Sequence, residues 1–180
     1  MSKAVFIDRD GTLNEEVHYL SDPDKFSLIK GSLEGLKILT KAGYRIILVT
    51  NQAGIAKGKL TLLQLEAIHS RMQRILSRNG IALSPEEIFF CPHRGEDNCG
   101  CRKPNVKNFK EAQKRFNLDP AKSYVIGDKT SDLEAGRRGG YATILVKTGY
   151  GGTDAKYDVL PDFIAKDLLE AAKFIIERGA

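Results

Sequence analysis

Two aspartates, Asp8 and Asp10, stand one residue apart directly after a short apolar run at 4–7. If the chain stays extended there, both carboxylates point to the same side. Adjacent carboxylates repel one another, so they tend either to share a cation or to differ in pKa. A third carboxylate, Asp128, follows another apolar run and would complete an oxygen site for Mg²⁺. This ion typically uses one or two carboxylates, water and a substrate phosphate.

Such a cluster suits the hydrolysis of phosphate esters. One carboxylate can act as the nucleophile and form an aspartyl-phosphate, while a metal and cationic side chains hold the phosphoryl oxygens. A second carboxylic acid protonates the leaving oxygen and then activates water. Asp8 suits the first role and Asp10 the second. An isolated Asp-x-Asp pair could instead cap a loop. The longer string Asp-Arg-Asp-Gly-Thr at 8–12 is more specific for a catalytic site.

A second group of possible ligands lies within eleven residues and includes all three cysteines of the chain. It comprises Cys91, His93, Cys99 and Cys101. Three thiolates and an imidazole form a standard closed zinc set, although the spacing is tighter than in zinc fingers. An odd number of cysteines argues against a disulfide framework. We therefore expect a structural Zn²⁺ that orders a loop; the alternative is reduced surface cysteines beside an incidental histidine.

Two cations, Arg102 and Lys103, follow the last of these ligands directly. A metal that ordered this loop would aim both at the substrate. The alternative for Lys103 is a solvated surface lysine, the usual environment of lysine. Lys129, next to Asp128, is also expected to contact the substrate.

Apolar runs alternate with helical patterns along the chain, and this alternation predicts the elements that position these residues. Strands are expected at 4–7, 45–50, 88–91, 124–127 and 142–147. Helices are expected at 32–42, from Thr61 to about Asn79, and at 106–117, 131–138 and 167–178. Ser32 is predicted as an N-cap, and Thr61 with Gln64 as a capping box. The polar segment 14–29 is expected to be a loop over the crevice.

This alternation favours an α/β fold, a Rossmann-like three-layer α/β/α sandwich with a mostly parallel sheet. Ligands bind such sheets outside the carboxyl ends of the strands. The candidate side chains all follow strand ends, so we expect them on one rim. No linker divides the chain, and 180 residues are enough for one domain with a real core.

The composition narrows the class of protein. The formal net charge is +5, but basic and acidic residues are interspersed and no basic arm occurs. This disfavours a nucleic-acid partner; a zinc-stabilised nucleic-acid-binding module remains the non-enzyme alternative. No signal peptide and no apolar run of about 18 residues is found, so we expect a cytoplasmic protein without a membrane partner. We also expect a monomer.

Four strings, in this order, resemble the four motifs of the haloacid dehalogenase-like phosphatases. They are Phe6-Ile-Asp8-Arg-Asp10-Gly-Thr12, Val49-Thr50-Asn51-Gln52, Cys101-Arg102-Lys103-Pro104 and Ile126-Gly127-Asp128-Lys129. The resemblance covers nearly the whole chain. It implies one phosphatase domain over 1–180, with minimal cap loops and a zinc-bound loop.

The resemblance also implies roles for individual residues. Asp8 would be the nucleophile and Asp10 the general acid/base. Mg²⁺ would be held by Asp8, the Asp10 carbonyl and Asp128. Thr50 and Lys103 would bind the transferring phosphoryl group, although Thr50 could simply cap a strand end. Asp132 is expected to support Lys103 or cap the following helix, rather than bind metal.

The cysteine segment resembles two branches of this family, the heptose-1,7-bisphosphate phosphatases and the histidinol-phosphate phosphatases. The stretches 50–58 and 146–151 favour the heptose branch, as do the extra cations. Only residues 94–98 separate the two ligand pairs, and this short spacing resembles the histidinol-phosphate branch more closely. The resemblance thus implies removal of the C7 phosphate from a small phosphorylated sugar, with histidinol phosphate as the alternative substrate.

The heptose branch implies further substrate contacts. They are Arg9, Glu16, Val17, His18, Tyr19, Asn51, Gln52 and Ala53, in addition to Arg102 and Lys129. His18 stands where members of the family often have glycine. Apart from this position, His18 and His69 are interpreted as ordinary surface or helix histidines.

Overall fold

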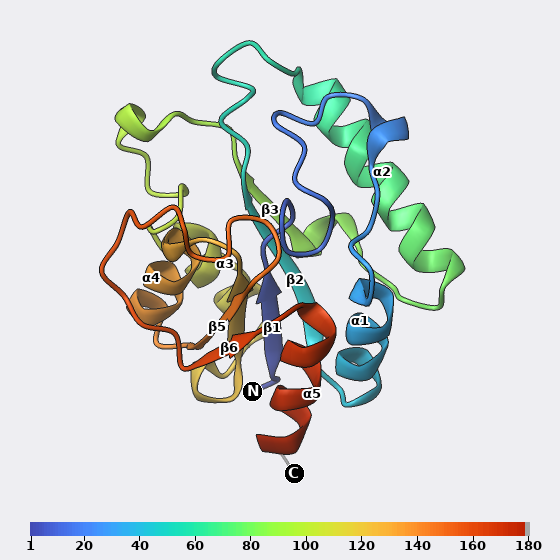
Figure 1. Cartoon of the computed structure of the whole chain (residues 1–180), viewed down its shortest axis with the longest axis vertical. Helices are drawn as coiled ribbons and strands as arrows, with labels where there is room; N and C mark the ends of the chain where they lie inside the picture. Colours follow the sequence, from blue (N-terminus) through green and yellow to red (C-terminus); the bar gives the residue numbers. More distant parts are fainter. Residues whose placement is uncertain (179–180) are drawn as a thin grey trace.

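The computed structural model describes residues 1–178, and its centre is a six-stranded sheet in the order β3-β2-β1-β4-β5-β6. All neighbouring strands pair in parallel (Figure 1). The strands are β1 (Ala4–Ile7), β2 (Arg45–Asn51), β3 (Ile88–Cys91), β4 (Tyr124–Gly127), β5 (Ala142–Val146) and β6 (Phe163–Ala165). The predicted three-layer α/β fold with a parallel sheet is confirmed.

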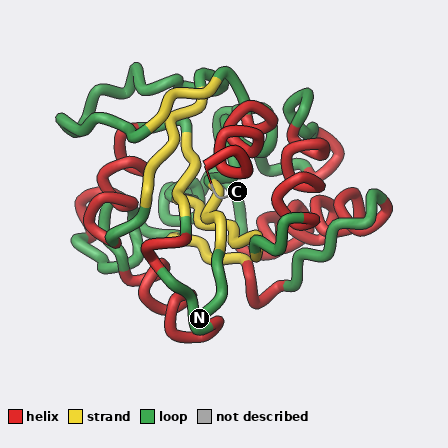
Figure 2. Tube along the Cα trace, turned by 90° about the horizontal axis from the view of Figure 1, so that it is seen from below, coloured by secondary structure: helices red, strands yellow, loops and turns green. Residues whose placement is uncertain are grey.

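Within residues 1–178, five α-helices cover the two faces of the sheet (Figure 2). They are α1 (Ser32–Lys41), α2 (Leu62–Arg78), α3 (Lys107–Phe116), α4 (Thr130–Gly139) and α5 (Leu168–Arg178). No helix within residues 1–178 has both the length and the apolar character needed to cross a membrane.

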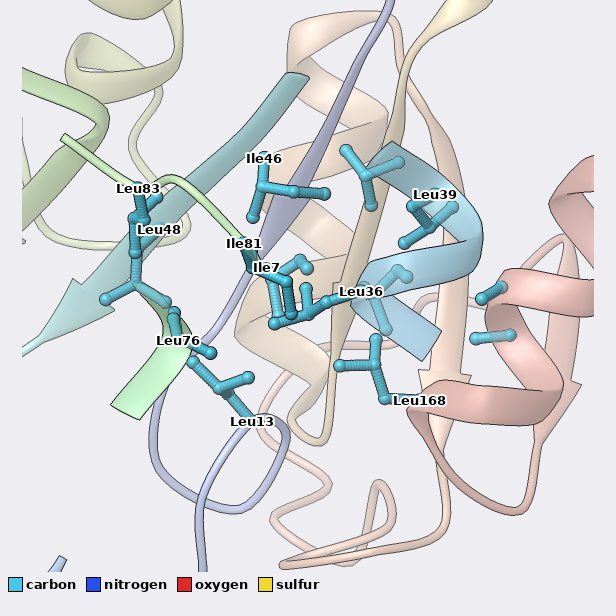
Figure 3. Packing of buried hydrophobic residues seen from close by; sticks show 14 of the residues in the cluster. Ile7, Leu13, Leu36, Leu39, Ile46, Leu48, Leu76, Ile81, Leu83 and Leu168 are labelled. Carbon is cyan, nitrogen blue, oxygen red and sulfur yellow. The ribbon is translucent and has the colours of Figure 1, made fainter. Parts of the chain in front are cut away.

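Alternate residues of the central strand β1 belong to two separate cores, because successive side chains of a strand point to opposite faces. Val5 and Ile7 belong to the larger core, which packs against α1, α2 and α5. Figure 3 shows part of it, including Ile7 of β1, Leu36 of α1 and Leu168 of α5. Phe6 belongs to the smaller core, against α3 and α4.

The strand order places a topological switch point between β1 and β4. The chain moves from β1 outward through β2 and β3, then crosses back to add β4, β5 and β6 on the other side. Loops diverge at such a point, and they leave a crevice at the carboxyl ends of the strands. The loops that follow these strands gather along one edge of the sheet, away from the two termini (Figure 1).

Most predicted boundaries agree with the structure to within one residue, which is the usual uncertainty of helix ends. The capping box of Thr61 and Gln64 is confirmed. The predicted loop at 14–29 is confirmed, with one 3₁₀ turn at Pro23–Lys25.

One prediction about the elements is wrong, and one strand was missed. Ser32 is not the N-cap of α1, because Gly31 holds that position; the Ser32 hydroxyl instead donates to the Leu13 carbonyl at 2.9 Å. The sixth strand, β6, was not predicted. Its three residues are too few for a periodic signal, and its pairing with β5 is completed by Asp162, which accepts hydrogen bonds from the Thr143 N–H and hydroxyl.

Candidate active site

The carboxylates of Asp8 and Asp128 meet at the switch point of the sheet. Asp8 follows β1 directly, and Asp128 follows the neighbouring β4. The Asp8 N–H donates to the Ile126 carbonyl at 3.0 Å, which extends the pairing of the two strands to the site itself. Carboxylate oxygens of Asp8, Asp128 and Asp132 lie within 4.8 Å of one another. The prediction that remote carboxylates converge on one rim is therefore confirmed.

Asp128 is fully buried, and its surroundings suit a cation. Its Oδ2 accepts a hydrogen bond from the Tyr150 N–H at 2.8 Å, whereas its Oδ1 has no hydrogen-bond partner among residues 1–178. Burial and the nearby Asp8 carboxylate raise the pKa of Asp128 to about 8. A buried oxygen without a donor beside a second carboxylate is the donor set that a divalent cation would satisfy.

Lys103 lies at the centre of the site and is only 4% exposed, so the interpretation as a surface lysine is wrong. Its Nζ lies 2.8 Å from Asp8 Oδ1 and 2.6 Å from Asp132 Oδ1, and donates to the Val49 carbonyl at 2.6 Å. Burial alone would lower the pKa of Lys103, but the two carboxylates raise it. The lysine therefore stays charged.

Asp132 has both of the supporting roles expected for it. One carboxylate oxygen faces Lys103, and the other accepts from the Lys129 N–H at 3.1 Å, at the start of α4. The Lys103 segment is held to β2 by Asn51, which accepts from the Lys103 N–H and donates to its carbonyl. These contacts fix the ammonium group beside Asp8.

Asp10 lies beside Asp8 and accepts hydrogen bonds from three side chains. The donors are Arg9, Asn14 and Gln52, at distances of 2.8–3.1 Å. Burial alone would raise the pKa of Asp10, but the Arg9 charge and these hydrogen bonds lower it. Gln52 also donates to the Thr50 hydroxyl at 2.8 Å, which connects the Asp10 carboxylate to the end of β2.

These residues open into a cavity of about 220 Å³. Its walls include Asp8, Asp10, Glu16, Val17, His18, Tyr19, Thr50, Asn51, Gln52, Ala53, Arg102, Lys103, Lys129 and Asp132. The structure therefore brings almost all of the predicted catalytic and substrate-binding residues to one cavity. Asp128 lies just behind the wall, next to Asp8.

Arg9 is the exception, because it is absent from the cavity wall. Its guanidinium is 1% exposed and does not line the cavity, because it is turned toward Asp10 and His69. His69 is in a helix, as expected, but it is buried rather than at the surface.

Five residues of the cavity wall were not predicted: Leu20, Gly54, Lys57, Ser131 and Tyr150. Lys57 Nζ donates to the Tyr19 hydroxyl at 2.9 Å, and both residues line the cavity. Lys129 Nζ lies 3.3 Å from Glu16 and 4.4 Å from the centre of the Tyr150 ring. Lys57 and Tyr150 lie inside the stretches 50–58 and 146–151, so attention to those stretches could have found them.

The cysteine segment forms a compact cluster, and Cys91 is buried at its base. The Sγ atom of Cys99 lies 3.5 Å from that of Cys91 and 3.6 Å from that of Cys101. His93 Nδ1 lies 3.6 Å from Cys91 Sγ and 3.3 Å from Cys101 Sγ. Ligands of a tetrahedral zinc with bonds of about 2.3 Å are separated by roughly 3.7 Å, so the four atoms have the dimensions of such a site.

Comparisons with known proteins agree with this geometry. A family model described as HAD-hydrolase-like matches residues 100–171. A D-glycero-beta-D-manno-heptose-1,7-bisphosphate 7-phosphatase from Haemophilus ducreyi is 39% identical, over 96% of this chain and 98% of its own length. The chain belongs to the haloacid dehalogenase-like phosphatases. The similarity to that relative covers almost all of both chains, so it is not confined to a shared motif.

A solved structure supports the same placement within the haloacid dehalogenase-like phosphatases. It is the D,D-heptose 1,7-bisphosphate phosphatase from Bordetella bronchiseptica, complexed with magnesium and phosphate. It superposes with a TM-score of 0.89 at 34% identity and covers 99% of both chains. A relative from Photorhabdus laumondii, 37% identical over 82% of this chain, is the corresponding alpha-heptose enzyme. The chain therefore lies in the heptose bisphosphate phosphatase branch of the family.

Proposed function

We propose that this phosphatase removes the C7 phosphate of D-glycero-D-manno-heptose 1,7-bisphosphate, in the biosynthesis of nucleotide-activated heptose. The observation that carries the proposal is the convergence of Asp8, Asp128 and Lys103 in a cavity, in a chain similar to heptose bisphosphate phosphatases over nearly its full length. The argument for histidinol phosphate as the alternative substrate is the short spacing between the pair Cys91 and His93 and the pair Cys99 and Cys101. The nucleic-acid-binding alternative has no feature of the cavity in its favour.

The chemistry follows from the positions of the two aspartates. An oxygen of Asp8 attacks the phosphorus of the C7 phosphate, and the bond from phosphorus to the sugar oxygen breaks. Asp10 gives its proton to that leaving oxygen, and the sugar departs as an alcohol. Asp10 then takes a proton from water, which attacks the aspartyl-phosphate, releases inorganic phosphate and restores Asp8.

Cationic and polar groups would hold the transferring phosphoryl group. Lys103 is already fixed beside Asp8, and the Thr50 hydroxyl lines the same wall of the cavity. Asp8, the Asp10 carbonyl and Asp128 would hold Mg²⁺, which when bound neutralises charge that develops on the phosphoryl oxygens. The unpartnered Asp128 oxygen supports this assignment.

A bisphosphate also matches the charge on the walls of the cavity. Arg102, Lys129 and Lys57 all line it in addition to Lys103. The first phosphate needs Lys103 and the metal, which leaves the other three cations for the phosphate at C1. Histidinol phosphate has one phosphate and a cationic amine, so it would use fewer of them.

The same proposal includes a structural Zn²⁺ on Cys91, His93, Cys99 and Cys101, supported by the dimensions of their cluster. We further propose that residues 1–180 form a single phosphatase domain that acts as a monomer in the cytoplasm. A highly charged sugar bisphosphate does not cross a bilayer unaided. This favours an enzyme located in the compartment where the substrate is made.

Turnover of the candidate substrates tests the proposal directly. We expect kcat/KM with Mg²⁺ to be higher on the alpha or beta heptose 1,7-bisphosphate than on histidinol phosphate, and inorganic phosphate to come from C7. The Asp8→Asn variant should fold normally and lose turnover. Faster hydrolysis of histidinol phosphate, or normal turnover by Asp8→Asn, would refute the proposed substrate or the proposed mechanism, respectively.

A further inference from the structure

Arg9 is the largest fully buried side chain of the described structure, and it lies outside the cavity. A guanidinium has five N–H donors, accepts nothing and stays charged at any pH that the protein would survive. Its burial therefore requires acceptors and a negative charge close by. The structure provides these through Asp10 and His69.

The contact between Arg9 and Asp10 fixes the orientation of a carboxylate. Arg9 Nε and Nη2 donate to Asp10 Oδ1 at 3.1 and 3.0 Å, and Nη2 also donates to Oδ2 at 2.8 Å. A planar guanidinium that bonds both oxygens sets the plane of the carboxyl group as well as its position. The ammonium of a lysine could act only as a point charge.

The remaining side of the guanidinium is held by His69, from the middle of α2. Arg9 Nη1 lies 3.3 Å from His69 Nε2, and His69 is only 7% exposed. Because Arg9 can only donate, Nε2 must be the unprotonated acceptor nitrogen, so the ring is neutral with its proton on Nδ1. The His69 ring also packs near Phe90 of β3, with ring centres 6.1 Å apart.

We infer that Arg9 and His69 are positioning residues for the general acid/base: His69 fixes Arg9, and Arg9 fixes the carboxyl group of Asp10. Neither side chain lines the cavity. The inference rests on the role of Asp10 in the proposed function, but it does not depend on which phosphate ester is the physiological substrate. The inference gives a function to a buried arginine and a buried histidine that do not line the cavity.

Leaving-group dependence separates this role from a general loss of structure. An alkyl phosphate needs a proton on its leaving oxygen, whereas 4-nitrophenyl phosphate releases a stable anion and hardly needs one. kcat/KM reports the steps up to loss of the leaving group. His69→Phe, which removes the acceptor, should therefore lower kcat/KM on an alkyl monophosphate on the order of 10-fold or more. The loss on 4-nitrophenyl phosphate should be only about 2-fold.

His69→Gln supplies an amide oxygen for Arg9 and should restore most of the alkyl-ester activity. The neighbouring Ser70→Ala, at an exposed position of the same helix, is the matched control and should behave like the wild type. Equal losses on both classes of ester, or full alkyl-ester activity in a folded His69→Phe protein, would overturn the inference. Thermal unfolding of each variant shows whether the native fold is kept.

A second measurement covers the case in which His69→Phe does not fold. In a double-mutant cycle, Arg9→Lys should lower alkyl-ester kcat/KM on the order of 10-fold in the wild type. It should have almost no effect in an Asp10→Asn background. Additive losses would contradict action through Asp10. If both ester classes are hydrolysed but the heptose bisphosphate is not, the proposed substrate fails while this inference stands.

Discussion

The ammonium group of Lys103 bridges two carboxylates, one directly after β1 and one in the first turn of α4. It lies 2.8 Å from an oxygen of Asp8 and 2.6 Å from one of Asp132, and all three side chains are buried. Removal of one partner from a buried ion pair leaves uncompensated charge and typically destabilises by 3–5 kcal/mol. The lysine is therefore part of both the folding and the chemistry of the site.

We predict that Lys103→Met lowers kcat by about 10²–10³-fold, because a donor aimed at the phosphoryl group is lost. The variant should also unfold at a lower temperature, since Asp8 and Asp132 would face each other without a cation. Kinetics and thermal unfolding at neutral pH measure the two effects. Lys107→Met, at an exposed position of α3, is the control. If Lys103→Met kept the kcat of the wild type, Lys103 would not be a catalytic residue.

Gly149 lets the backbone pass close to the cation site. A Cβ at this position would overlap Asp128 Oδ2 and come within 2.6 Å of the Gly11 Cα, and the residue has a φ of +57°. We predict that Gly149→Ala displaces Asp128 and raises the Mg²⁺ concentration for half-maximal activity by about 10-fold. A titration of activity against Mg²⁺ measures the shift.

Gly58→Ala is a matched control for this change. Gly58 has a similar φ of +65°, but a Cβ there would meet no atom within 4 Å. Both variants carry the strain of a left-handed backbone, about 1–2 kcal/mol, and only Gly149→Ala adds the overlap with Asp128. Equal Mg²⁺ requirements in the two variants would show that backbone strain, rather than displacement of Asp128, sets the effect.

Removal of the metal from the cysteine cluster should loosen the segment that carries Arg102 and Lys103. We predict one Zn²⁺ per chain, a lower unfolding temperature after chelation, and activity that returns with Zn²⁺ plus Mg²⁺ but not with Mg²⁺ alone. Metal analysis, calorimetry and turnover measure the three effects. Cys99→Ser should resemble the chelated protein. A metal-free protein with unchanged stability would argue against a structural zinc.

The position of the site could be predicted because its main residues sit at strand ends. Asp8, Asp128 and Cys91 each end or follow a short apolar run, and parallel strands bring such ends to one edge. The environment of Arg9 could not be predicted, since its acceptor His69 lies 60 residues away on α2. Ser32 carries an N-cap residue type, yet its hydroxyl is used by a loop carbonyl elsewhere in the chain. Local patterns do not contain such long-range partners.

His69 should make stability depend on pH in a defined window. Burial, with the neighbouring Arg9 charge, lowers the pKa of His69 to about 3, against about 6.5 in an unfolded chain. Between these values the unfolded state binds a proton at this position and the native state does not, so acid favours unfolding. The stability tied to neutral His69 is complete above pH 6.5. It falls by up to about 1.4 kcal/mol for each pH unit below that.

The His69→Gln variant has no group that titrates at this position. Comparing it with the wild type therefore separates the contribution of His69 from that of the other acid-sensitive groups. We predict that the difference in unfolding free energy between the wild type and His69→Gln is constant above pH 7. Below about pH 6.5 the wild type should lose stability faster than the variant. Denaturant unfolding at several pH values from 7.5 to 4.5 measures the difference. A difference that stays constant over this range would mean that His69 accepts a proton in the native state, and its bond to Arg9 would then have to be reassigned.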